Sequence, residues 1–119
     1  MKIDPIVNSN VRLKANGNTI RLCGQIDQVN PGEFLDPFFE KVLKEMGDNL
    51  VIDFSELDFM NSNGIKSIVT FIMSRKKGTK VNLQVDPGRI WQKTSLKVVA
   101  SLDPELISVT EVGQVNQVN

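Results

Sequence analysis

The sequence predicts an α/β fold with a mixed β-sheet of about five strands and helices packed mainly on one face of that sheet. Two observations lead to this prediction. Short segments with alternating or continuous apolar residues, typical of strands, are interleaved with longer segments whose apolar residues recur at helical spacing. The resulting chain order is strand, strand, helix, strand, helix, strand, helix, strand, and strands joined through a helix tend to run parallel by right-handed crossovers.

The first two strands are predicted to form a hairpin. Apolar and polar residues alternate over residues 11–15, and Asn16-Gly17-Asn18 is a turn signal that commonly joins antiparallel strands. The second strand is predicted over residues 19–26, with one face formed by Ile20, Leu22, Gly24 and Ile26. A loop that contains Asn30-Pro31-Gly32 follows this strand.

The first helix is expected to begin with Asp36 as its N-cap and Pro37 at its first helical position, because both residues are favoured there. An earlier turn over residues 33–35 is left open. Gly47 is expected to end this helix. Its apolar stripe is predicted to consist of Phe38, Val42, Leu43 and Met46. The aromatic cluster is interpreted as part of the core rather than as a partner-binding patch, and it consists of Phe34, Phe38 and Phe39.

A central strand and a second helix follow. Residues 50–54 are apolar almost throughout, which is typical of a strand covered on both faces. The helix is predicted to run from Ser62 to about Lys77, with Gly78 terminating it. Its buried face is predicted to consist of Ile65, Ile68, Val69, Ile72 and Met73. The run Arg75-Lys76-Lys77 is interpreted as its solvated last turn, where cations are favoured.

The C-terminal part is predicted to hold two strands and a helix. The fourth strand covers residues 81–85, and the last short strand covers residues 106–109. Between them a helix is expected from Ile90 to Leu102, with core contacts from Leu96, Val99, Leu102 and a partly buried Trp91. Residues 1–110 are expected to form a single domain, and residues 111–119 are expected to form a flexible tail.

The composition excludes several classes of function. The 14 basic and 14 acidic residues give no net charge, so a nucleic-acid partner is not expected. The chain has no histidine and a single cysteine, Cys23, interpreted as a buried structural thiol. We therefore expect no metal site, no cofactor and no catalytic residues. The protein is predicted not to be an enzyme. Asp53 and Asp58 are interpreted as a strand-end residue and a loop charge rather than a metal-binding pair.

The chain is also expected to lack contact with membranes. The N-terminus has no apolar core of a signal peptide, and no apolar run approaches the ~20 residues that span a bilayer. We therefore expect a cytoplasmic protein.

One segment combines a hydroxyl group with the start of a helix. Asn61-Ser62-Asn63-Gly64 follows an apolar strand and a short acidic connector, and an amphipathic helix begins directly after it. The free backbone N–H groups and the positive end of the helix dipole favour an anion at this position. A phosphate on Ser62 would be such an anion. Taken alone, the same pattern is also explained by Ser62 acting as the helix N-cap.

This segment resembles the STAS domain, the fold of bacterial anti-sigma factor antagonists. The residues that carry the resemblance are Ile52-Asp53-Phe54-Ser55 and Phe59-Met60-Asn61-Ser62-Asn63-Gly64-Ile65. The resemblance implies a STAS-like sheet with helices mainly on one face, and it places Ser62 at the position that a partner kinase phosphorylates in many members. The family has Asp and Ser where this chain has Asn61 and Asn63, so a negative charge is missing beside the hydroxyl.

The resemblance also implies a surface for a protein partner. The run Gly24-Gln25-Ile26-Asp27 resembles the family's Gly-Glu-Leu-Asp, whose Asp lies near the phosphorylation loop, although a solvated loop acid explains Asp27 equally well. In the family the exposed side of the helix after the phosphorylation loop contributes to docking. The implied partner-binding residues are Asp27, Asn61, Asn63, Gly64, Lys66 and Thr70. The expected partner is a serine kinase or an anti-sigma-like regulator, and a weak homodimer is left open.

Two functions of different kinds follow from these observations. The first is a non-enzymatic regulator in a partner-switching pathway, whose binding to its partner is controlled by phosphorylation of Ser62. The alternative is a module that is never phosphorylated and that binds a signalling enzyme or a small ligand constitutively, which Asn61 in place of the family's Asp favours.

Overall fold

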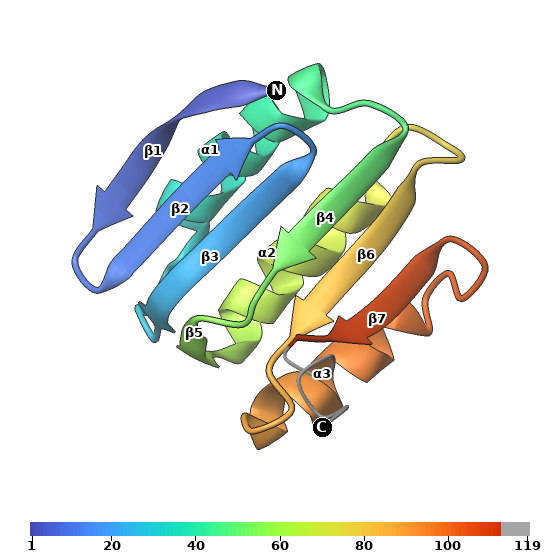
Figure 1. Cartoon of the computed structure of the whole chain (residues 1–119). Coiled ribbons are helices and arrows are strands. Elements are labelled where there is room, and N and C mark those ends of the chain that lie inside the picture. The colour runs from blue at the N-terminus through green and yellow to red at the C-terminus, as the bar shows by residue number, and fades with distance from the viewer. Residues whose placement is uncertain (113–119) are drawn as a thin grey trace, which may run out of the picture.

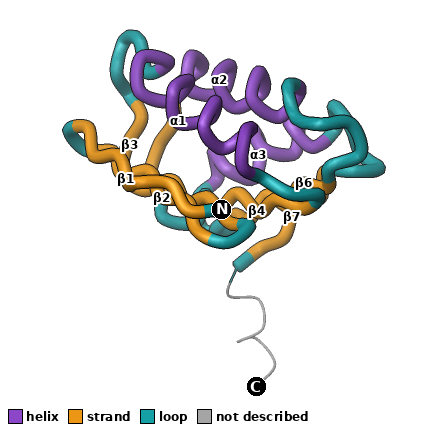
Figure 2. Tube along the Cα trace, turned by 90° about the horizontal axis from the view of Figure 1, so that it is seen from above, coloured by secondary structure: helices purple, strands orange, loops and turns teal. Residues whose placement is uncertain are grey.

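A single mixed sheet with three helices on one of its faces forms the protein, as the computed structural model shows for residues 1–112 (Figure 1, Figure 2). In chain order the elements are β1 (Lys2–Asn8), β2 (Val11–Asn16), β3 (Thr19–Ile26), α1 (Gly32–Glu45), β4 (Asn49–Asp53), β5 (Leu57–Met60), α2 (Ser62–Met73), β6 (Lys80–Val85), α3 (Ile90–Ala100) and β7 (Ile107–Glu111). The predicted α/β class and the placement of the helices are therefore confirmed.

The sheet has seven strands rather than the predicted five or so. Its order is β1-β2-β3-β4-β6-β7, and β5 pairs with β3 beside the end of β4. The pairs β1–β2 and β2–β3 are antiparallel, whereas the pairs β3–β4, β3–β5, β4–β6 and β6–β7 are parallel. The sequence pattern missed β1, because Asp4-Pro5 interrupts it at a register shift that an edge strand tolerates. It missed β5 because that strand is only four residues long.

The core lies between the helices and one face of the sheet. Side chains on this face line up across the pairing register from Ile20 through Ile52 to Leu83, and all three are fully buried. The apolar faces of the helices close the core from the other side with Phe38, Ile68 and Leu96. The three predicted core phenylalanines are buried, as expected.

Strand β3 divides its pairing between two partners. Its first half, Thr19 to Arg21, pairs with β4, and its second half, Gly24 to Ile26, pairs with β5. Gly24 lies at the change of partner and has a positive φ of 99°. A Cβ atom on it would lie 1.7 Å from the carbonyl oxygen of Asn10, so the backbone of the turn between β1 and β2 leaves no space for a side chain there.

Helix α1 begins earlier than predicted. It starts at Gly32, and Pro37, expected at its first position, lies inside it on the exposed side. The backbone N–H groups of Phe34 and Leu35 donate to the carbonyl of Pro31 and thereby form the first turn. Both side chains are buried, and this burial outweighs the hydrogen bond that Pro37 cannot donate.

Helix α2 ends at Met73, four residues before the predicted end at Lys77. Met73 is exposed, whereas Phe71 is buried and stacks on Phe39 of α1 with ring centroids 4.4 Å apart. Arg75 was expected in a solvated turn, but its side chain is buried. It donates to the carbonyls of Ile72 and Thr79 and pairs with Asp103 at 2.7 Å.

The C-terminal elements are each shifted slightly from the prediction. Helix α3 ends at Ala100, so Leu102 is exposed instead of part of the core, while Trp91 is half-buried as predicted. Strand β7 continues to Glu111, and Val112 N–H still donates to the Val85 carbonyl at 2.8 Å. The remainder of the predicted flexible tail, residues 113–119, lies outside the described residues.

Candidate functional site

Strand β5 carries the chain directly to Ser62 at the carboxyl ends of the parallel strands (Figure 1). Asn61 follows β5, and its backbone N–H donates to the carbonyl of Ile26 at 2.9 Å. The side chain of Asn61 then caps α2, because its Oδ1 accepts from the N–H of Gly64 at 2.9 Å. Asn61, and not Ser62, is therefore the N-cap of this helix.

Ser62 is the first residue of α2, and its side chain is exposed. Within residues 1–112 no group forms a hydrogen bond with its hydroxyl. The first turn of α2 contains no acidic residue that would offset the helix dipole. Ser62 thus presents a free hydroxyl at a position that favours negative charge.

Two asparagine amides fasten the loop between β3 and α1 to the start of α2. Asn61 Nδ2 donates to the carbonyl of Gln28 at 2.8 Å, and Asn63 Nδ2 donates to the carbonyl of Val29 at 3.1 Å. A carboxylate accepts hydrogen bonds but cannot donate them, so an aspartate at position 61 could not make this bond. The two residues that depart from the family pattern therefore have a definite structural role.

Gly64 was expected among the partner-binding residues, but it is buried. A Cβ atom on it would lie 2.6 Å from Met60 Cγ and 3.1 Å from Ile26 Cγ2. Its role is to let the first turn of α2 lie close to β5 and to the end of β3.

The other predicted contact residues lie on the surface around Ser62. Asp27, Asn63, Lys66 and Thr70 are all exposed. Asn63, Lys66 and Thr70 line a hollow of about 250 Å³ between α1 and α2, together with Asn30, Gly32, Asp36 and Ser67. A second hollow of about 220 Å³ continues along the same two helices past Phe39, Leu43 and Ser74. Asp27 belongs to neither.

Val29 is a member of this surface that sequence reasoning missed. It lies at the tip of the β3–α1 loop and is 91% exposed, and Asn63 holds its carbonyl. Its aliphatic side chain is therefore fully accessible on the surface beside Ser62. The sequence signal was available, because Val29 is the only large apolar residue in the loop of residues 27–33.

The chain matches a known protein family over most of its length. The STAS domain profile matches residues 10–106, which include every element from β2 to α3. The chain belongs to the STAS domain family. A similar solved structure is the crystal structure of an anti-sigma factor antagonist from Mycobacterium paratuberculosis, with a TM-score of 0.63 and 16% sequence identity, covering 90% of this chain and 87% of that one. No curated protein matches this STAS domain in sequence.

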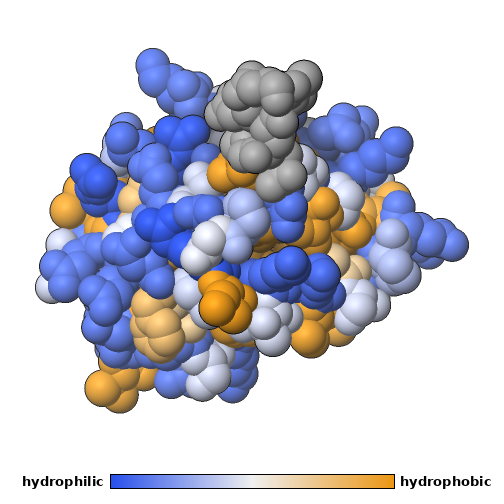
Figure 3. All heavy atoms as spheres, turned by 60° about the horizontal axis from the view of Figure 1, so that its bottom comes forward, coloured by the Kyte–Doolittle hydropathy of each residue, from blue (hydrophilic) through white to orange (hydrophobic). Residues whose placement is uncertain are grey.

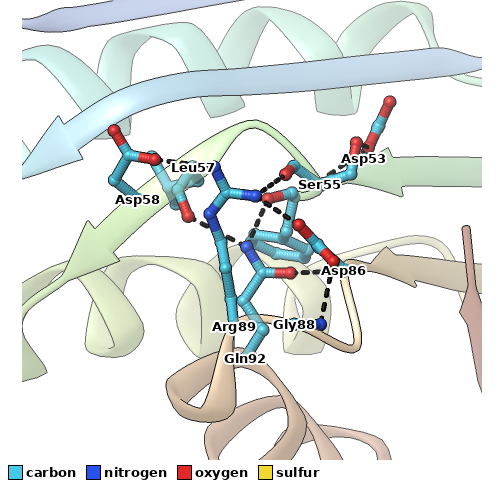
Figure 4. Close-up of polar contacts among 9 residues, drawn as sticks. Asp53, Ser55, Leu57, Asp58, Asp86, Gly88, Arg89 and Gln92 are labelled. Atoms are coloured by element: carbon cyan, nitrogen blue, oxygen red, sulfur yellow. Dashed lines mark hydrogen bonds and ion pairs between the residues drawn. The ribbon is translucent and has the colours of Figure 1, made fainter.

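A polar network fixes the connector between β4 and β5 of this STAS domain (Figure 4). Gln92 of α3 is fully buried; its Nε2 donates to the carbonyls of Phe54 at 2.6 Å and Leu57 at 2.9 Å. Its Oε1 accepts from the N–H of Asp86 at 2.8 Å. This single amide therefore ties α3 and the end of β6 to the segment that leads to Ser62.

Arg89 reinforces the same connector from its exposed side (Figure 4). Its guanidinium donates to the carbonyl of Ser55 at 2.8 Å and to Asp58 at 2.7 Å, and it also pairs with Asp86. The hydrogen bond to Asp58 is the main cause that raises the pKa of Arg89 above its ordinary value. Asp58 was interpreted as a loop charge, but it belongs to β5 and anchors Arg89 there.

Asp53 and Cys23 are both buried, and each lies close to other charged or polar side chains of the fold. Asp53 ends β4 as predicted; it pairs with Arg21 at 3.0 Å, and its Oδ1 accepts from the N–H and the hydroxyl of Ser55. Cys23 is buried as predicted, and burial, followed by the nearby Glu56 carboxylate, raises the pKa of its thiol. Among residues 1–112, no three His, Cys, Asp or Glu side chains are grouped so that they could hold a metal ion.

Sequence reasoning did not single out Gln92 or Arg89, although Gln92 gave a signal. It lies on the helix face that Leu96 and Val99 define, four and seven residues away, so a polar side chain occupies a core position. Such a residue needs buried hydrogen-bond partners, which only the fold supplies.

In the described part of the chain, no helix has the length and apolar character needed to cross a membrane.

The two asparagines differ in how many backbone groups they satisfy, which predicts unequal effects of their loss. Asn61→Ala removes a helix cap and the bond to Gln28, and we expect it to lower the free energy of unfolding by about 2 kcal/mol. Asn63→Ala removes one exposed bond to Val29, and about 0.5 kcal/mol is expected. Urea unfolding of both variants measures the difference. Equal losses would contradict the role of Asn61 as the cap.

Proposed function

We propose that this STAS domain is a non-enzymatic, cytoplasmic regulator of the anti-sigma-factor-antagonist type. It binds a protein partner, a serine kinase or an anti-sigma-like regulator, in a partner-switching pathway. Phosphorylation of Ser62 by the kinase releases the complex. The observation that carries this proposal is the free, exposed hydroxyl of Ser62 at the start of α2, while Asn61 provides the cap.

The division of roles between Asn61 and Ser62 supports a modifiable hydroxyl. A serine that caps a helix has its side-chain oxygen engaged by a backbone N–H group of the first turn. Here Asn61 Oδ1 accepts from Gly64, so Ser62 can be modified while the cap is kept. The free N–H groups of the first turn and the absence of acidic residues there favour the resulting phosphate.

Release follows from the charge that a phosphate adds. It carries about −1.5 to −2 charges at neutral pH. The surface that docks the partner surrounds Ser62 and consists of Asp27, Val29, Asn63, Lys66 and Thr70. Placed within this contact, the phosphate must lose water and approach the partner's own groups. A loss of about 1.4 kcal/mol weakens binding tenfold, so even a modest mismatch switches a micromolar complex.

Intact mass spectrometry of the protein purified from its native host tests this proposal. We expect a species heavier by one phosphate, and we expect it to be absent in Ser62→Ala. Ser74→Ala is the matched control, because Ser74 is also an exposed serine, at the C-cap of α2, but its hydroxyl donates to the Thr70 carbonyl. A phosphate that persists in Ser62→Ala, or that is lost in Ser74→Ala, would contradict Ser62 as the acceptor.

The second candidate is a module that binds a signalling enzyme or a small ligand without ever being phosphorylated. The bond from Asn61 Nδ2 to the Gln28 carbonyl favours it, because this bond holds the surface in one arrangement with no added charge. Unmodified protein under all growth conditions, together with a partner retained equally by the protein and by Ser62→Ala, would select this candidate.

A further inference from the structure

The outward face of α3 carries apolar side chains that no described part of the chain covers. Ile90 is 80% exposed and Val98 is 64% exposed. Trp91 lies seven residues before Val98, hence on the same side of the helix, and it is half-buried. The opposite face of α3 is already packed on the sheet through Gln92, Leu96 and Val99. Ile90 and Val98 therefore do not contribute to the core.

Two lysines form a basic row beside these apolar residues. Lys93 and Lys97 are both exposed and lie four residues apart, so they are neighbours on the helix surface. The helix contains no Asp or Glu, and within residues 1–112 neither lysine takes part in an ion pair. Arg89, by contrast, already pairs with Asp58 and Asp86. The uncompensated charge of α3 thus belongs to the two lysines.

We propose that this outer face of α3, formed by Ile90, Lys93, Thr94, Lys97 and Val98, is a docking surface for an acidic amphipathic helix of a protein partner. The apolar residues of that helix contact Ile90 and Val98, and its carboxylates pair with the lysines. Figure 3 shows hydrophobic patches among hydrophilic side chains on the side of the molecule where the parallel strands end. The surface is distinct from that of Ser62, because α3 packs on β6 and β7 (Figure 1).

The charges disfavour two other occupants. In a symmetric dimer through this face, the lysines of one copy would approach those of the other, and like charges repel. An anionic membrane would attract the lysines, but α3 has only 11 residues and buries its main apolar face against the sheet. A few side chains then remain to enter the bilayer, which is far less than an interfacial helix uses.

The test uses a synthetic helical peptide with leucines along one face and glutamates beside them. Trp91 is the only tryptophan in the chain, so its fluorescence reports binding at α3. We expect saturable binding that weakens as salt rises, and at least about tenfold weaker binding to Lys93→Glu/Lys97→Glu. The control Lys41→Glu/Lys44→Glu, which changes two exposed lysines of α1, should alter the affinity less than about twofold.

Further variants keep the test decisive if charge reversal disturbs the helix. Val98→Ser should also weaken binding of the peptide. Ser62→Ala should leave peptide binding unchanged, so the outcome at α3 is independent of the proposed phosphorylation. Four outcomes would overturn the proposal: no fluorescence change, equal binding of a peptide with lysines in place of glutamates, a dimer that Lys93→Glu/Lys97→Glu alters, or binding to phosphatidylglycerol vesicles in place of the peptide.

Discussion

Gly24→Ala should lower the free energy of unfolding by about 3 to 5 kcal/mol, a large part of the stability of a domain of this size. Two effects combine at this position. The positive φ of 99° is unfavourable for alanine, and the new Cβ would lie 1.7 Å from the Asn10 carbonyl oxygen. Because the clashing atom of Asn10 is a backbone oxygen in the turn between β1 and β2, the clash is relieved only by moving strand β3 or this turn. Chemical denaturation of the purified variant measures the loss.

Gly17→Ala is the matched control for this substitution. Gly17 also has a positive φ, 62°, in the two-residue turn between β2 and β3, but a Cβ atom there meets nothing within 4 Å. Only the conformational part of the effect remains, and about 1 kcal/mol is expected. If the two alanine variants lose the same stability, the close approach of Asn10 is not what requires glycine at position 24.

Gln92→Met should lower the free energy of unfolding by about 3 kcal/mol or more. Methionine fills nearly the same volume but pairs with none of the three backbone groups that Gln92 satisfies, the carbonyls of Phe54 and Leu57 and the N–H of Asp86. Each buried group left unpaired costs about 1 to 3 kcal/mol. Hydrogen exchange should also accelerate at Leu57 and in the rest of β5, since the connector loses its anchor.

Lys93→Met introduces the same side chain one residue later, on the exposed face of α3. A change within about 0.5 kcal/mol is expected there. If Gln92→Met were equally mild, with exchange in β5 unaltered, the connector would be held by Arg89 alone.

The fold could be predicted from the sequence wherever burial follows a regular period. The alternation of Val81, Leu83 and Val85 identifies a strand because one face of it is buried in the core. Strand β5 escapes this reasoning, because Asp58 and Phe59 in its middle face solvent and break the pattern. The start of α1 was missed for a related reason: local preference favoured Asp36 and Pro37, and the burial of Phe34 and Leu35 outweighed it.

The position of the candidate site could be predicted from the sequence, but its hydrogen bonds and close contacts could not. The motif around Ser62 indicated a helix start, and α2 begins there. Which residue caps the helix depended on the loop after β3, because Asn61 makes its other bond to Gln28, 33 residues earlier in the chain. Gly64 is a close-packing residue for the same reason, since Ile26 reaches it only once β3 and β5 are paired. Contacts between such distant segments leave no periodic signal.

The divided pairing of β3 separates the element that presents Ser62 from the one that holds the sheet together. The ladder from β1 through β4 to β7 is continuous without β5, which pairs with β3 through three residues. Substitutions in β5 and in the Ser62 turn therefore change no strand pairing of the ladder that runs from β1 to β7.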